Sequence, residues 1–535
     1  MSTKHLSRRD FVEVTSLVAA AAALPRFGPA NAAFELEETT VAQLQDAMRA
    51  GRLTARKITK AYLDRIAALD RRGPALRAVL ETNPDALAIA DALDAERKAG
   101  KVRGPLHGVP VIVKDNIDTH DQMMTTAGSL ALEGNRALRD AHIVERLRAA
   151  GAVILAKANL SEWANFRSTR SSSGWSGRGR QCRNPYVLDR NPSGSSSGSG
   201  SAVSANLCAL AVGTETDGSI ISPSTMCGIV GIKPTVGLVS RAGIIPIAHS
   251  QDTAGPMCRT VADAAALLTA LAGVDPRDAA TAAAEGHIPA DYTTFLDKDG
   301  LRGARIGVPY RRAGNNPIVD RVVEDAIAVL KAHGAEVVDP AEIETAGQVG
   351  TNERDVLQYE FKADLNAYFA TMPEHIKVRT LEQLIAFNEA NKDREMPFFG
   401  QETFIASQAR GPLTDQAYLD ARAKCVELTR DKGIDATMGK HNLDALLGPS
   451  GGVPSIVDLA GGGGGGGGPG SSQFPAVAGY PHITVPAAFH MGLPLGVSFY
   501  GKAWSEPVLI KLAYAFEQAT KARRAPTFTP TLALS

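Results

Sequence analysis

The chain has 535 residues, a length that favours two or three domains. Hydrophobic residues make up 44% and charged residues 21% of it, as in ordinary globular proteins. Lysine plus arginine and aspartate plus glutamate both number 57, so the net charge is close to zero. This balance argues against nucleic acid or an anionic membrane surface as a partner.

The first 32 residues have the pattern of an export signal. The segment SRRDF (7–11) contains twin arginines, residues 14–24 are mildly apolar, and ANA (30–32) has the form of a cleavage site. We therefore expect a twin-arginine signal peptide over residues 1–32, recognised by the twin-arginine export machinery, and a periplasmic or secreted mature chain. An ordinary N-terminal helix is the alternative. The apolar stretch is too short to span a bilayer, so no stable membrane anchor is expected.

Helical and strand-like patterns alternate along the rest of the chain. Helical patterns occur at 39–70 (two helices), 85–99, 140–150, 260–272, 319–333 and 506–523, and the composition of 202–211 is compatible with a helix. Strand-like runs occur at 108–114, 152–156, 229–234, 304–308 and 335–338. The alternation predicts an α/β fold around a mainly buried sheet. A more polar, mostly helical portion around 352–445 is expected to form a cap or side layer.

The cysteines do not form a recognisable framework. They are five in number and widely spaced: Cys182, Cys208, Cys227, Cys258 and Cys425. An odd number at such spacing is a poor disulfide pattern, and without clustered histidines it does not resemble a zinc site. We therefore interpret all five as packing residues and expect no metal.

Residues 461–468 are eight consecutive glycines. Such a run is typical of a disordered surface loop. A mobile flap over a functional site is the alternative, because lids over active sites also need flexible segments. The sequence leaves both interpretations open.

A serine- and glycine-rich stretch, NPSGSSSGSGSA (191–202), raises a different question. Its composition is typical of a linker, yet residues 194–198 also match the G-x-S-x-G nucleophile elbow. An elbow at Ser196 needs a strand directly before it, and the preceding NPYVLDRNP (184–192) is a poor strand. No spacing selects a partner among the later histidines: His249, His441, His482 and His490.

Two other segments offer catalytic chemistry. Lys114 follows the apolar run 109–113, so its side chain is expected to start at the end of a buried strand. Desolvation lowers the pKa of a lysine, and a neutral lysine can act as a base. Residues 213–219, GTETDGS, form a glycine-containing turn in which backbone N–H groups can converge as an oxyanion hole requires.

Together these segments resemble the amidase signature family of serine hydrolases, over nearly the whole mature chain. The motifs that carry the resemblance are GVPVIVKDNI (108–117), NPSGSSSGSGSA (191–202), GTETDGSI (213–220), GIVGIKPTVGLVS (228–240), SQDTAGPM (250–257) and AVAGYPHITVP (476–486). The resemblance implies a catalytic domain over 33–535 with a large mixed β-sheet core covered by helices on both faces.

The resemblance also implies a Ser-Ser-Lys triad that needs no cofactor. Lys114 matches the base, Ser195 the bridging serine, whose preceding peptide linkage is cis in the family, and Ser219 the nucleophile. The implied oxyanion donors are four backbone N–H groups: Thr216, Asp217, Gly218 and Ser219. The expected reaction is hydrolysis of a carboxylic amide through an acyl-enzyme.

Departures from the family pattern concern the substrate. Asp217 replaces a glycine, and Ile221 stands where many members have arginine. With GWSGRGRQCRNPY (174–186), the Asp217 variant looks most like the peptide amidases, which act on C-terminal peptide amides. Ser171, Ser172 and Ser173 match the position where the family lines its substrate channel, although ordinary polar loop residues would look the same.

Other functions remain open at this stage. One is a general aliphatic or aromatic amidase, or an esterase. Another is the amidotransferase subunit that helps to make Gln-tRNA, which is a cytoplasmic task that the predicted export signal opposes. A third is a catalytically silent amide-binding protein, which the intact triad opposes. The oligomeric state cannot be derived from the sequence.

Overall fold

The structure is a computed structural model that describes residues 36–312, 316–461 and 469–532. The chain divides into two units, Met1–Glu37 and Glu38–Ser535, and the second is described below. The predicted signal peptide and residues 462–468 of the glycine run lie outside the described residues, so the export route stays a prediction. None of the described helices combines the length and the apolar character needed to cross a bilayer.

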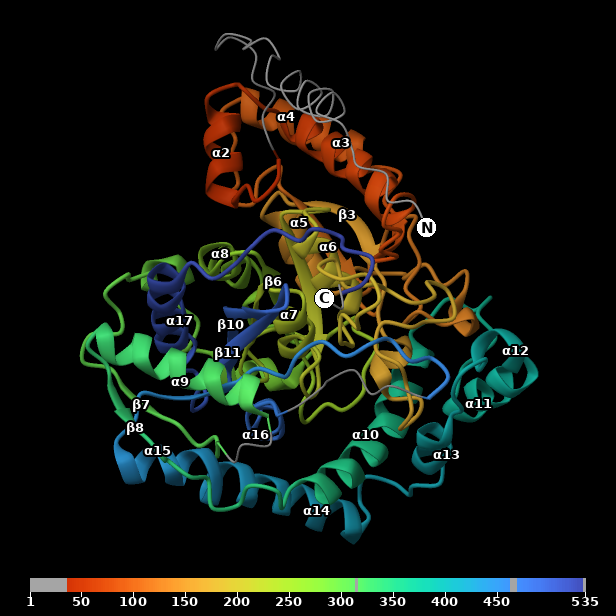
Figure 1. Ribbon diagram of the computed structural model, residues 1–535. Coiled ribbons are helices and arrows are strands. Elements are labelled where there is room, and N and C mark those ends of the chain that lie inside the picture. Colours follow the sequence, from red (N-terminus) through yellow and green to blue (C-terminus); the bar gives the residue numbers. More distant parts are fainter. Residues whose placement is uncertain (1–35, 313–315, 462–468, 533–535) are drawn as a thin grey trace, which may run out of the picture. The chain divides into compact units, whose positions relative to one another are not determined.

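An eleven-stranded mixed sheet forms the centre of the described chain (Figure 1). In spatial order its strands are β1 (Val79–Thr82), β3 (Val153–Ala158), β2 (Pro110–Lys114), β4 (Leu210–Glu215), β6 (Thr253–Cys258), β5 (Val230–Lys233), β10 (His482–His490), β11 (Leu493–Tyr500), β9 (Ala445–Pro449), β7 (Arg305–Gly307) and β8 (Glu336–Val338). Strand β2 runs parallel to β3 and β4, and β7 runs parallel to β8 and β9. The other neighbours are antiparallel.

Helices surround this sheet. They are α2 (Val41–Arg49), α3 (Ala55–Arg65), α4 (Ala86–Lys98), α5 (His142–Ala149), α6 (Ser197–Ser204), α7 (Ile221–Met226), α8 (Val261–Leu271), α9 (Pro317–Ala332), α10 (Gly350–Ala370), α11 (Leu381–Ala390), α12 (Lys392–Glu395), α13 (Glu402–Gln408), α14 (Gln416–Val426), α15 (Asp435–His441), α16 (Gln473–Ala478) and α17 (Glu506–Thr520). Shorter 3-10 and π segments are η2 (Ile66–Asp70), η3 (Leu130–Leu132), η4 (Glu162–Asn165), η5 (Ala279–Ala284), η6 (Tyr292–Phe295) and η7 (Glu427–Ile434).

Helices α7 and α17 lie on opposite faces of strand β11. A Cβ built on Gly496 would meet Thr225 of α7, whereas Phe499 packs edge-on against Phe516 of α17 at a centroid distance of 5.9 Å. Residues 496 and 499 differ by an odd number, so their side chains point to opposite faces. The expected mixed sheet with helices on both faces is therefore present.

The five predicted strands and the patterned helices are present, but residues 202–211 do not form one helix. Helix α6 instead begins at Ser197, and β4 begins at Leu210. Small side chains explain this shift, because a Cβ at Gly198 would lie 2.3 Å from the Ala78 carbonyl oxygen. Close packing forms this helix despite the poor helix propensity of serine and glycine. The sequence patterns also missed β1, β4, β6, β9 and the β10–β11 hairpin.

Two smaller interpretations are confirmed. Residues 191–193, directly before the serine–glycine run, are not a strand, so the run is not a nucleophile elbow. It is not a linker either, because residues 195–204 are buried. All five cysteines are buried and free, as packing residues should be.

The portion from residue 350 to residue 441 is built from helices α10 to α15. Helix α10 packs through Phe361 and Phe369 into an apolar cluster that includes Trp163. The Trp163 ring meets Phe369 edge-on at a centroid distance of 6.2 Å. This packing fixes α10 against the segment after β3 and brings Glu353, in its first turn, to the site described next.

Candidate active site

Lys114 is the last residue of β2 and is fully buried. Its Nζ donates to Ser195 Oγ at 2.8 Å, to Thr214 Oγ1 at 2.8 Å and to the Thr214 carbonyl oxygen at 3.2 Å. Burial lowers the pKa of Lys114 to about 7, while the charges of Asp252 and Glu215 raise it in part. A large share of Lys114 is therefore neutral near pH 7, as a lysine base must be.

Ser195 follows a cis peptide bond from Gly194 and is fully buried. Its carbonyl oxygen accepts a hydrogen bond from the Ser161 N–H at 3.0 Å. A Cβ on Gly194 would lie 2.2 Å from Ser161 Oγ, so no larger residue fits at this position. These contacts hold the Ser195 hydroxyl toward Lys114.

Ser219 lies after β4, in the turn that leads to α7. Its carbonyl oxygen accepts the Ser196 N–H at 3.1 Å, so the segments that carry the two predicted serines are joined directly. The Glu215 carboxylate accepts the N–H groups of Ile220 at 2.7 Å and Ile221 at 2.9 Å. The turn around Ser219 is therefore fixed from both sides.

The turn also presents free backbone donors. Gly218 has φ +75°, a conformation that favours glycine and that can orient successive N–H groups toward one point. No acceptor among the described residues takes the N–H groups of Asp217, Gly218 and Ser219. Thr216 is held by its hydroxyl, which donates to Asp252 Oδ1 at 2.5 Å. Such an arrangement can bind an oxyanion.

Of the three serines 171–173, Ser173 lies beside the cis bond. A Cβ on Gly194 would lie 3.3 Å from Ser173 Cβ, and Ser173 Oγ accepts from Asn165 Nδ2 at 2.9 Å. The hydroxyls of Ser171 and Ser172 are buried without a partner in the described chain. They are thus available as hydrogen-bonding groups in the loop that carries Ser173.

Sequence reasoning missed two residues of the lysine environment. Thr214 bonds Lys114 twice, and Asn116 Nδ2 donates to Thr214 Oγ1 at 3.0 Å. Both residues lie inside motifs of the family, GTETDGSI and GVPVIVKDNI. The alternation of side chains at the end of β4 could have identified Thr214. Residues 214 and 216 point to one face of this extended segment, and Glu215 points to the other.

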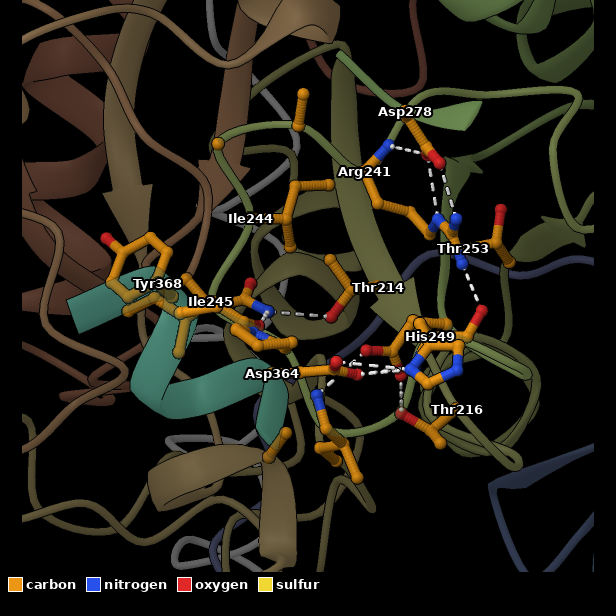
Figure 2. A pocket seen from close by; sticks show the side chains of 18 of the residues that line it. Thr214, Thr216, Arg241, Ile244, Ile245, His249, Thr253, Asp278, Asp364 and Tyr368 are labelled. Carbon is orange, nitrogen blue, oxygen red and sulfur yellow. Dashed lines mark hydrogen bonds and ion pairs between the residues drawn. The ribbon is translucent and has the colours of Figure 1, made fainter. Parts of the chain in front are cut away.

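A pocket of about 370 Å³ lies beside this network (Figure 2). Thr214 and Thr216 line it together with apolar residues such as Ile244 and Ile245, and Arg241 pairs with Asp278 in its wall. Lys114, Ser195 and Ser219 are not among the lining residues that the structure describes. The pocket therefore borders Thr214, the hydrogen-bond partner of Lys114, rather than Ser219, the predicted nucleophile.

Three side chains at or next to this pocket could in principle offer atoms to a metal: His249, Glu360 and Asp364. His249 Nδ1 lies 2.8 Å from Asp364 Oδ2, and Nε2 lies 3.5 Å from Glu360 Oε1. The hydrogen bond to Asp364 raises the pKa of His249. The contacts of His249 with Asp364 attach the loop around His249 to α10.

Comparison with known proteins identifies the family to which this chain belongs. Residues 57–510 match the family described as Amidase. The chain belongs to this family and is an amide-hydrolysing enzyme, which agrees with the resemblance found in the sequence.

Three relatives are similar to this chain over most of its length. The chain is similar to the solved structure of native peptide amidase from Stenotrophomonas maltophilia, with 52% identity and a TM-score of 0.87 over 92% of this chain and 99% of that one. It is 43% identical to a probable amidase of Arabidopsis thaliana, over 93% of each chain. It is also 34% identical to a glutamyl-tRNA(Gln) amidotransferase subunit of Alkalilimnicola ehrlichii, over 91% of this chain and 98% of the relative.

Proposed function

We propose that this enzyme hydrolyses C-terminal peptide amides to the free acid and ammonia through Lys114, Ser195 and Ser219. The contact of 2.8 Å between Lys114 Nζ and Ser195 Oγ carries the proposal. It joins a buried base of lowered pKa to a hydroxyl that can pass a proton onward.

Acylation begins with neutral Lys114. Its Nζ accepts the proton of Ser195 Oγ, which in turn accepts the proton of Ser219 Oγ. Ser219 Oγ then forms a bond to the amide carbonyl carbon, and the carbonyl electrons move to the oxygen. The backbone N–H groups of residues 216–219 stabilise this oxyanion, which is the charge that develops in the transition state.

Collapse of the tetrahedral intermediate breaks the C–N bond. The proton held by the relay returns through Ser195 to the leaving nitrogen, so ammonia departs neutral. A water molecule then gives its proton to the same relay and attacks the ester carbonyl. The acid leaves and Ser219 recovers its proton, so the cycle is balanced without a cofactor.

Peptide amides are the favoured substrate class because identity is higher with the peptide amidase than with the amidotransferase subunit, 52% against 34%. Asp217 supports the same choice, since the sequence at this position looks like that of peptide amidases. The unpaired hydroxyls of Ser171 and Ser172 offer hydrogen bonds to the polar backbone of a peptide.

The test is ammonia release from amidated dipeptides, compared with simple aliphatic and aromatic amides. We expect Ser219→Ala to lower kcat/KM by about 10⁴-fold or more, because it removes the nucleophile. Ser505→Ala, a serine before α17, serves as the control and should keep wild-type activity. Hydrolysis by Ser219→Ala at the wild-type rate would refute the mechanism. Faster turnover of simple amides than of peptide amides would make the enzyme a general amidase.

A further inference from the structure

A buried carboxyl pair lies directly behind the oxyanion turn. Asp217 belongs to the turn itself, and one of its carboxylate oxygens, Oδ1, is buried without a hydrogen-bond partner in the described chain. Glu353 comes from the first turn of α10, 136 residues away in sequence, and is 6% exposed. The mechanism above uses neither side chain, yet burying two acids side by side is costly unless a proton is shared.

Glutamine side chains connect Glu353 to the neighbouring segments. Gln251 Nε2 donates to Glu353 Oε1 at 3.3 Å and also to the Thr216 carbonyl oxygen at 3.2 Å. Gln473 Nε2, at the start of α16, donates to Glu353 Oε2 at 2.8 Å. Glu353 is thus attached through one amide to the backbone of the oxyanion turn and through another to the segment that follows the glycine run.

The charges around the pair favour a single shared proton. Burial, together with the charge of Asp217, raises the pKa of Glu353 to about 8, and burial also raises the pKa of Asp217. The nearby cation is Lys233 of β5, which also faces Glu215 and Glu506 and whose own pKa burial lowers to about 8. Helix α14 contributes the Cys425 thiol, whose pKa burial raises to about 12 so that it stays neutral. Because Lys233 is shared among Asp217, Glu215 and Glu506, it does not neutralise both members of the pair.

We propose that Glu353 is a positioning residue that holds the oxyanion turn in its active geometry by sharing one proton with Asp217. The protonated carboxyl donates to the other, and the hydrogen bond joins α10 to the turn. Loss of the proton leaves two carboxylates that repel, and the backbone donors of residues 216–219 move out of place. The inference rests on the proposed function, in which these donors bind the oxyanion.

The kinetic test is the pH profile of kcat for ammonia release by the full chain. The wild type should lose activity above about pH 8, with little change in KM. Glu353→Gln should lose this alkaline limb, because an amide does not ionise but still donates to Asp217. Asp217→Asn should lose it too, and serves if Glu353→Gln fails to fold. Glu517→Gln removes another buried acid with a raised pKa, on α17, and should keep the limb.

An infrared titration without substrate tests the shared proton separately from catalysis. Buried acids such as Glu517 and Asp118 absorb equally in both proteins. The wild type should show, in addition, a protonated carboxyl component that disappears between pH 7 and pH 9 and that Glu353→Gln lacks. An identical band in both proteins would overturn the shared proton, whatever the reaction is. An alkaline limb retained at the same pH in Glu353→Gln would overturn the positioning role. If instead the proposed function is wrong, the wild type leaves peptide amides intact, while the carboxyl component is still present in the wild type and missing in Glu353→Gln.

Discussion

Two fully buried lysines lie on neighbouring strands and differ in what surrounds them. Lys114 ends β2, and Lys157 lies on β3, paired in register with Val113. Burial lowers the pKa of both. Lys157 Nζ donates to the Ile117 carbonyl oxygen at 2.5 Å and to Thr125 Oγ1 at 2.8 Å.

The groups around the two lysines suit different roles: a base in the proposed mechanism for Lys114, and a structural role for Lys157. Lys157 lies close to Asp115 and Asp118, whose charges favour its protonated form. Lys114 instead bonds the Ser195 hydroxyl, whose segment is joined to that of Ser219. Burial alone therefore does not make a lysine catalytic. The proposed mechanism also requires the chain of exchangeable hydroxyl protons beside Lys114.

The strongest way to test this difference is to remove each amine in turn. Lys114→Met keeps the apolar stem and removes the base. We expect kcat for peptide amides to fall by at least about 10³-fold, because proton transfer from Ser195 is lost. Circular dichroism should show that the protein stays folded. A loss below about tenfold would remove Lys114 from the role of base.

Lys157→Met should have the opposite effect. Removing this amine leaves the buried Ile117 carbonyl oxygen without its donor and takes a positive charge from beside Asp115 and Asp118, which costs about 1–3 kcal/mol in the free energy of unfolding. Denaturant titration measures this loss, and kcat per folded molecule should stay within about tenfold of the wild type. A collapse of kcat in a stably folded variant would contradict the structural role of Lys157.

The smallest expected effect concerns the acid limb of the pH profile, which Lys114 sets and which the other substitutions should leave in place. Protonated Lys114 cannot accept a proton, so kcat/KM should rise about tenfold per pH unit below its pKa of about 7 and level off there, before the alkaline limb begins above about pH 8. The midpoint should be the same in wild type, in Lys157→Met and in Glu353→Gln. A midpoint that moves with Lys157 would mean that the two lysines titrate together.

The sequence predicted those parts of the site that are local to a motif. The position of Lys114 at the end of a buried strand follows from the apolar run before it, and its contact with Ser195 was implied by the family resemblance. The strands β2, β3, β5, β7 and β8 follow from β-branched runs. The patterns failed at 202–211, because composition alone does not show that Gly198 packs against the Ala78 carbonyl oxygen and allows an earlier helix.

Contacts between distant segments could not be predicted. The pairing of Asp217 with Glu353 joins a turn to a helix that no motif marks, and Gln251 connects them from a third segment. Thr214 was inside a quoted motif, but its role depends on the neighbour relation of β2 and β4. One sequence contains periodicity along each element and no information on which elements become neighbours.

The tight packing of α6 has a consequence for altering this enzyme. Gly194 and Gly198 leave no space for a single added carbon, and the helix behind Ser195 is buried along its whole length. Random substitutions there should yield insoluble protein rather than new specificity. A library meant to change substrate choice is better placed at exposed positions such as Phe398, whose ring lies 5.8 Å from Trp175, close in sequence to Ser171–Ser173.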